Sequence, residues 1–116
     1  MKPKVLFIVA DDPRTSARPA EAIRIVAGVR AWEMAEISLY LRDAVVLALS
    51  EHAEELADGE NYARYLPILA NSGGPIYVER SAPQRFELAS AALPYEEVSD
   101  QQLAALAASS DYVFRF

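Results

Sequence analysis

Cysteine is absent from this 116-residue chain, and its absence excludes several kinds of chemistry. Without a thiol, the protein cannot form disulfides, carry a persulfide, use a cysteine nucleophile or bind a metal through sulfur. The single histidine, His52, follows Glu51 on the expected solvent-facing side of a helix. No Gly-x-Ser-x-Gly turn is present, so a serine nucleophile activated by histidine is not expected.

Positive charge is also scarce. Lysine occurs only at Lys2 and Lys4, and the formal net charge is −6. An acidic domain is repelled by the phosphate backbone of nucleic acids and by anionic lipid. We therefore expect neither nucleic acid nor a membrane surface as a partner.

Long hydrophobic runs are missing as well. The first apolar run covers residues 5–10 and ends at Asp11. It is too short for the apolar region of a signal peptide and far too short to span a membrane. We interpret it as a buried strand and expect a cytoplasmic protein.

The chain is otherwise rich in apolar residues, which make up 53% of it, whereas charged residues make up 24%. This balance is typical of a globular protein, and the length suits one domain covering residues 1–116. Short segments with strand-like composition recur along the chain, and all but the weak fourth one are mainly apolar. They span residues 5–10, 35–41, 76–78, 95–98 and 112–116.

Segments with helical spacing separate these strands. They cover residues 19–32, 60–72 (interrupted by Pro67) and 84–93, and a further helix runs from Asp43 as its cap to Asp58 and Gly59. Residues 72–75 read as a turn. Ser99 and Gln102 have the spacing of a capping box before the last helix, and Arg115 suggests that the last strand lies near an edge. The alternation predicts an α/β fold, a three-layer α/β/α sandwich with a mainly parallel sheet of about five strands, and leaves their order open.

Ligands of parallel α/β sheets bind at the loops that follow the carboxyl ends of the strands. The first three such loops here carry charged and polar residues. They are Asp11, Asp12 and Arg14, then Arg42 and Asp43, then Glu79, Arg80 and Ser81. We take all eight as candidate ligand-binding residues.

Several readings of these residues are open. Asp11, Asp12 and Glu79 offer oxygen ligands for Mg²⁺, although aspartates in such loops more often cap turns or pair with Arg14 or Arg18. Arg14, Arg42 and Arg80 could clamp a carboxylate or phosphate, or form ion pairs at the surface.

Glu79 could act as a general acid or base if it is buried, or simply be neutralised by an arginine. No glycine-rich phosphate loop precedes a helix, and we expect no cofactor. The segment FIVADDPR resembles the acidic loop of phosphoacceptor receiver domains. Here, however, the third strand ends in Glu79, and no lysine lies beyond Lys4.

The layout as a whole resembles the DsrE/DsrF-like family of small α/β proteins. The segments that carry the resemblance are KVLFIVADDP, AEISLYLRDAVVLAL, ILANSGGPIYVE and SDYVFRF, which together extend over nearly the whole chain. The resemblance implies a homotrimer or homohexamer. It also implies that the reactive cysteine of sulfur-carrying members would fall at or near Glu79, where a carboxylate cannot form a persulfide.

These observations favour a family member that lacks the sulfur-carrier cysteine and acts as an oligomeric small-ligand-binding or accessory protein. The second hypothesis is an enzyme that uses Asp11, Asp12 and Glu79 with a divalent metal. The third is a receiver-like signalling domain. No residue pattern specifies a catalytic reaction.

Overall fold

The computed structural model describes residues 2–71, 75–88 and 90–116, so residues 72–74 of the predicted turn lie outside it. Its centre is one five-stranded sheet in the order β4-β3-β2-β1-β5, in which every neighbouring pair is parallel. The strands are β1 (Lys4–Val9), β2 (Glu36–Leu41), β3 (Ile76–Glu79), β4 (Glu96–Val98) and β5 (Tyr112–Arg115). The α/β class, the parallel sheet and the edge position of the last strand are confirmed.

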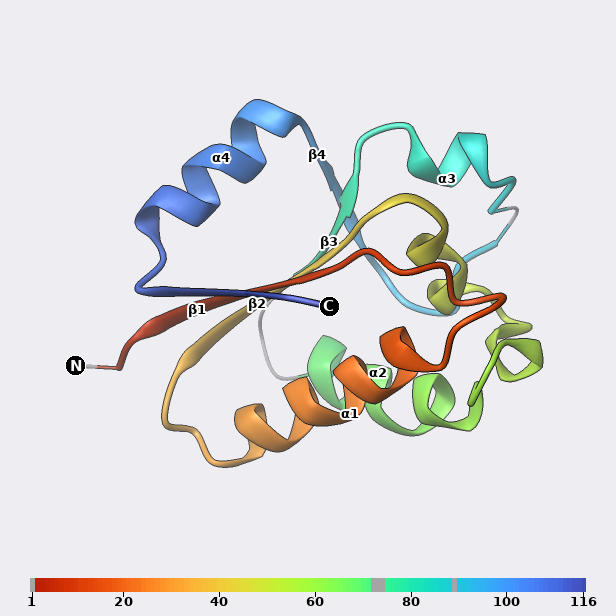
Figure 1. Cartoon of the computed structure of the whole chain (residues 1–116), viewed down its shortest axis with the longest axis horizontal. Helices are drawn as coiled ribbons and strands as arrows, with labels where there is room; N and C mark the ends of the chain where they lie inside the picture. The colour runs from red at the N-terminus through yellow and green to blue at the C-terminus, as the bar shows by residue number, and fades with distance from the viewer. Residues whose placement is uncertain (1, 72–74, 89) are drawn as a thin grey trace.

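Helices cover the two faces of the sheet unequally. Helices α1 (Arg18–Ala31) and α2 (Glu60–Asn71) lie together on one side of the sheet, and α4 (Asp100–Ser109) lies on the other (Figure 1). Pro67 falls inside α2, as the sequence suggested, and the predicted capping box of α4 is present. None of the helices in the described ranges is long and apolar enough to cross a bilayer.

Most of the hydrophobic core belongs to the face with α1 and α2. Alternate residues of β1, among them Val5, Phe7 and Val9, pack there against Ile23 and Val26 of α1. This alternation follows from the geometry of a strand, in which successive side chains point to opposite faces. The face with α4 has a much smaller cluster. Its buried members are Leu6, Ile8, Tyr40 and Val98.

The prediction of a helix after Asp43 is wrong. The chain forms two 3₁₀ segments there, η1 (Asp43–Leu49) and η2 (Ala53–Glu55), and Asp43 makes no side-chain cap. Nearly every residue of η1 is buried, so the segment has no solvent-facing side of the kind that an amphipathic α-helix needs. After η2, Gly59 lies so close to that segment that a Cβ atom would clash with the carbonyl oxygens of Ala53 and Glu54.

The helix predicted over residues 84–93 is also wrong in its extent. Helix α3 spans only Ala82–Arg85, and Glu87, two residues further on, has a φ of 54°. The chain then extends, because Ala91 forms an isolated bridge with Ser50 and the Ala92 N–H donates to the Leu49 carbonyl over 2.8 Å. Burial of Ala82 and Pro83 anchors α3 beside the carboxyl end of β3.

Candidate functional site

The strand order brings the three predicted loops to one edge of the sheet. Strands β1, β2 and β3 are neighbours and parallel, so the loops that follow them leave the sheet at the same end. The amino end of α4 reaches this edge too, because Arg42 Nη2 lies 3.5 Å from Asp100 Oδ1. Four segments of the chain therefore reach this edge.

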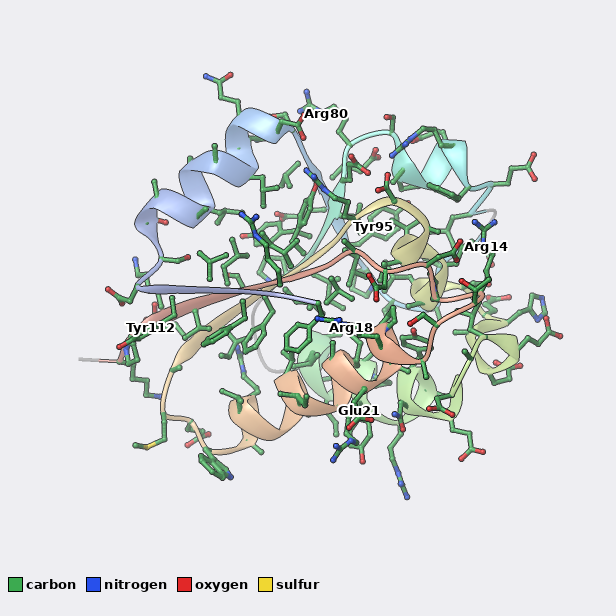
Figure 2. All side chains as sticks on the ribbon, in the orientation of Figure 1. Arg14, Arg18, Glu21, Arg80, Tyr95 and Tyr112 are labelled. Atoms are coloured by element: carbon green, nitrogen blue, oxygen red, sulfur yellow. The ribbon has the colours of Figure 1, made fainter. Side chains whose placement is uncertain are left out.

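The acidic loop after β1 is occupied by its own arginines. Arg14 holds the carboxylate of Asp12 with two hydrogen bonds, Nε to Oδ1 over 2.9 Å and Nη2 to Oδ2 over 2.8 Å. These bonds lower the pKa of Asp12 below its ordinary value. Asp11 faces Arg18, with 3.9 Å between Oδ2 and Nε. Figure 2 shows Arg14 and Arg18 well apart from Arg80.

Glu79 fastens the loop after β2 to the end of β3. Its Oε1 accepts from Arg85 Nη2 over 2.6 Å and from the Asp43 N–H over 2.9 Å. Arg85 also lies 3.4 Å from the Asp43 carboxylate. The side chain of Glu79 is only 20% exposed, so this double contact is partly shielded from water. Glu79 is thus neutralised by an arginine, but by Arg85 of α3 and not by its neighbour Arg80.

A cleft of about 410 Å³ opens between the end of β3 and the start of α4. It is lined by Glu79, Arg80, Ser81, Arg85, Ser99 and Asp100. Arg80 donates to the amide oxygen Oε1 of Gln102 over 3.5 Å, and it forms no ion pair with any carboxylate of the described residues. The cleft therefore contains a guanidinium group whose charge is not neutralised by a direct partner.

Two turns shape the cleft. Ser81 has a φ of 68°, a left-handed conformation that is strained for a residue with a side chain. Its N–H donates to Glu97 Oε1 of β4 over 2.9 Å, which holds the turn open. On the other side, the Ser99 hydroxyl accepts from the Gln102 N–H over 3.1 Å as the cap of α4. The first backbone N–H groups of α4 point out of the amino end of the helix, as they do in any α-helix.

Beneath the cleft lies a buried phenol. Tyr40 is fully buried, and the polar group that its hydroxyl faces is the Arg42 guanidinium. Burial raises the pKa of Tyr40, and the guanidinium of Arg42, which lies 5.8 Å from the ring centroid, opposes that rise. The Nε atom of Arg42 is likewise buried, and the Tyr40 hydroxyl is its polar neighbour. The two side chains thus serve as each other's polar partner next to the edge.

The structure brings only part of the predicted set together. Arg42, Asp43, Glu79, Arg80 and Ser81 gather around the ends of β2 and β3. The other predicted residues form a separate group after β1. The ring of Phe86 lies between the two groups, because the guanidinium groups of Arg14 and Arg85 both contact it. Within the described parts of the chain, no three His, Asp or Glu side chains lie close enough to hold a metal ion. The expected ligand set of Asp11, Asp12 and Glu79 is therefore not assembled.

Three residues of the edge were missed by sequence reasoning. Arg85 was placed on a long helix, and Ser99 and Asp100 were interpreted only as the start of α4. The signal that could have found the last two is the short segment 96–98 before them, because a parallel fourth strand brings its carboxyl end to the same edge. Arg85 gave no such signal, since its contact with Glu79 depends on how α3 ends.

The comparisons with known proteins agree with this architecture. A sequence model of the DsrE/DsrF-like family matches residues 3–116. The crystal structure of the YchN protein from E. coli is similar over 100% of both chains, with a TM-score of 0.82 at 21% sequence identity. No curated protein matches the chain. At that identity the YchN structure shows the fold alone, whereas the family match extends over nearly the whole sequence, so this chain is a member of the DsrE/DsrF-like family.

Proposed function

We propose that this protein is a DsrE/DsrF-like protein that binds a small anionic ligand, or a partner presenting an anionic group, and does not carry sulfur. The chain has no cysteine, and Glu79 at the end of β3 is held by Arg85 and the Asp43 N–H. A carboxylate fixed in this way is a structural group of the edge. It supplies neither a thiol nor a free base.

The single observation that carries the proposal is Arg80. Its guanidinium lines the cleft, and its only hydrogen bond with the described residues is a 3.5 Å contact to the neutral amide of Gln102. Arginine binds carboxylate and phosphate through two parallel hydrogen bonds. The amino end of α4 adds backbone N–H groups and the positive end of its dipole beside the same cleft.

Acidic neighbours limit the size and charge of the ligand. Asp100 lines the cleft and faces Arg42, and Glu97 holds the Ser81 N–H, so carboxylates surround the arginines. A ligand with one carboxylate or phosphate suits this arrangement better than a polyanion does. Displacement of Asp100 from Arg42 would release a second guanidinium for the bound group.

The test is titration of the purified protein with inorganic phosphate, sulfate and small monocarboxylates, followed by calorimetry and by thermal unfolding. We expect at least one anion to bind, and Arg80→Gln to weaken its binding at least tenfold. Arg64→Gln is the matched control, because Arg64 lies on α2 over the Tyr65 ring and outside the cleft. If the two variants bind the anion equally well, the cleft is not the binding site.

The assembly and the compartment belong to the same proposal. We propose a homo-oligomer, a trimer or hexamer as the family resemblance implies, working in the cytoplasm without nucleic acid or membrane as a partner. Native mass spectrometry of the gently purified protein tests the assembly and reports any bound small molecule by its mass.

A further inference from the structure

Strand β5 exposes an unusual amount of apolar surface for the edge of a sheet. Tyr112, Val113 and Phe114 are 57%, 37% and 48% exposed, and all four residues of the strand are accessible to solvent. Figure 1 shows β5 in front of the other strands, with no segment of the chain crossing before it. Edge strands normally carry charges, prolines or bulges that prevent pairing with another chain. Within β5, Arg115 is the only such residue.

The backbone of β5 is available on its outer side. The Phe116 N–H donates to the Ile8 carbonyl over 2.8 Å, and the Ala10 N–H donates to the Phe116 carbonyl over 2.8 Å. In a parallel pair, the residues that bond to the neighbour alternate along the strand. Tyr112, Phe114 and Phe116 therefore direct their backbone groups toward β1. Val113 and Arg115 direct theirs outward, where no strand of the described residues is paired with β5. Asp111, just before the strand, departs from this alternation, because its N–H donates to the Lys4 carbonyl over 2.7 Å, so the outward hydrogen bonds come from Val113 and Arg115 and from the Asp111 carbonyl.

The order of side chains around Val113 is self-complementary. Residues 111–115 read acid, aromatic, valine, aromatic, base. If two copies of β5 pair antiparallel about Val113, Asp111 of each copy lies opposite Arg115 of the other. Tyr112 likewise lies opposite Phe114. Opposite charges and aromatic pairs directly across two strands are stabilising.

This register also keeps each pair on the correct face. Val5 is paired with Tyr112 and Phe7 with Phe114, so the aromatic residues of β5 stand on the face of α1. The rings of Phe7 and Phe114 are stacked with centroids 5.5 Å apart, and those of Tyr112 and Phe114 are 6.5 Å apart. A partner strand would extend this row of rings. Figure 2 shows Tyr112 near the start of β5.

We infer that a second copy of this chain binds the outer side of β5, antiparallel and centred on Val113, so that the two sheets form one continuous ten-stranded sheet about a two-fold axis. The inference supplies a contact surface for the oligomer of the proposed function and makes no use of the ligand cleft. A two-fold contact produces a dimer, or a hexamer when it joins two trimers.

The sharpest test reverses one charge at a time. Asp111→Lys places lysine opposite Arg115 of the partner, and Arg115→Glu places glutamate opposite Asp111. We expect native mass spectrometry and sedimentation to give an even-numbered assembly for the unaltered protein, and half that mass for each variant alone. When the two variants are mixed, each lysine faces a glutamate and each Asp111 faces an Arg115, so the full mass should return as a mixed assembly.

A second variant does not depend on charge. Val113→Pro removes an N–H that faces outward, so it should leave the pairing of β5 with β1 intact and still halve the mass. It also covers the case in which Asp111→Lys fails to fold, because the Asp111 carboxylate accepts from the Lys4 N–H over 2.8 Å. Circular dichroism and thermal unfolding identify that case. Arg64→Glu on α2 is the control for charge reversal and should keep the full mass.

Several outcomes would overturn the inference. A monomeric or odd-numbered native assembly excludes a two-fold contact at β5, and it would leave the strand open to a different protein. Variants at residues 111, 113 and 115 that all keep the native mass place the contact elsewhere. Failure of the mixed charge variants to reassemble contradicts the register. None of these residues lines the cleft, so the two proposals can fail separately. A β5 variant that loses assembly should still bind the anion. Arg80→Gln should lose anion binding and keep the assembly.

Discussion

The two faces of the sheet differ in how much they bury. The face with α1 and α2 carries the large core, to which β1, β2, β3, both 3₁₀ segments and two long helices contribute. The face with α4 has a small cluster around Tyr40, and α4 itself has no buried residue. Hydrophobic stabilisation scales with the apolar area removed from water. The α1–α2 face therefore supplies most of the stability.

The thinner face is where the cleft lies. Ser99 and Asp100 at the start of α4 line it, and Arg42 and Tyr40 lie beneath it. Regions with few buried contacts open locally at lower free energy than the core does. A helix that is attached lightly can adjust to a ligand without disturbing the main core. The comparison teaches that the main core and the candidate binding cleft lie on different sides of one sheet.

The largest expected effect tests this division directly. Ile23 of α1 is fully buried in the large core, whereas Leu106 of α4 is only partly buried against the small cluster. Ile23→Ala should lower the free energy of unfolding by about 2–5 kcal/mol, because it removes apolar contacts and leaves a cavity. Leu106→Ala should cost about 1 kcal/mol, because half-burial gives roughly half the transfer free energy. Urea unfolding measures both. Equal losses would show that the two faces contribute alike.

The cap of α4 is expected to matter next. The Ser99 hydroxyl accepts from the Gln102 N–H, and Gln102 Oε1 accepts from the Ser99 N–H over 2.7 Å. Ser99→Ala should lower the free energy of unfolding by about 1 kcal/mol and speed amide exchange in the first turn of α4. Ser109→Ala is the control on the same helix, because that hydroxyl donates to the Leu106 carbonyl near the other end. If α4 amides exchange equally fast in both variants, the cap does not hold the helix.

The sequence predicted the strands well for a physical reason. Residues 5–10 and 76–78 are continuous apolar runs, and a strand buried on both faces needs such a run. Residues 35–41 are apolar except for Glu36 and Ser38. The capping box at Ser99 is a local device, so its spacing alone identified it. The 3₁₀ segments after Asp43 were missed because their form depends on burial on every side. No helical period records that in the sequence.

The candidate site was predictable only in its location. The loops after the strands contain Glu79, Arg80 and Ser81, and parallel strands bring such loops to one edge. The partner of Glu79 was not predictable. Arg85 reaches it from α3, which follows the left-handed turn at Ser81 and spans Ala82–Arg85 instead of the predicted 84–93. Which charges pair, and which remain without a partner, is decided by tertiary packing.

The smallest expected effect at neutral pH compares one buried phenol on each face. Tyr62 packs in the large core and Tyr40 in the small cluster. The Tyr62 hydroxyl has no hydrogen-bond partner among the described residues, whereas the Tyr40 hydroxyl faces Arg42. A buried hydroxyl without a partner costs desolvation energy. Tyr62→Phe should therefore leave the free energy of unfolding unchanged or raise it by up to about 1 kcal/mol at pH 7. A loss of stability would reveal a hydrogen bond to the Tyr62 hydroxyl.

Alkaline pH should magnify the difference between the two faces. Burial, reinforced by the negative charge of Asp58, raises the pKa of Tyr62 strongly, whereas Arg42 opposes the rise at Tyr40. Above about pH 10 an unfolded tyrosine loses its proton while the buried phenol keeps it, so the native state loses stability as pH rises. Tyr62→Phe should reduce this loss more than Tyr40→Phe does. Urea unfolding between neutral and alkaline pH measures this loss of stability. An equal effect of both substitutions would mean that the fold raises the pKa of Tyr40 as much as that of Tyr62.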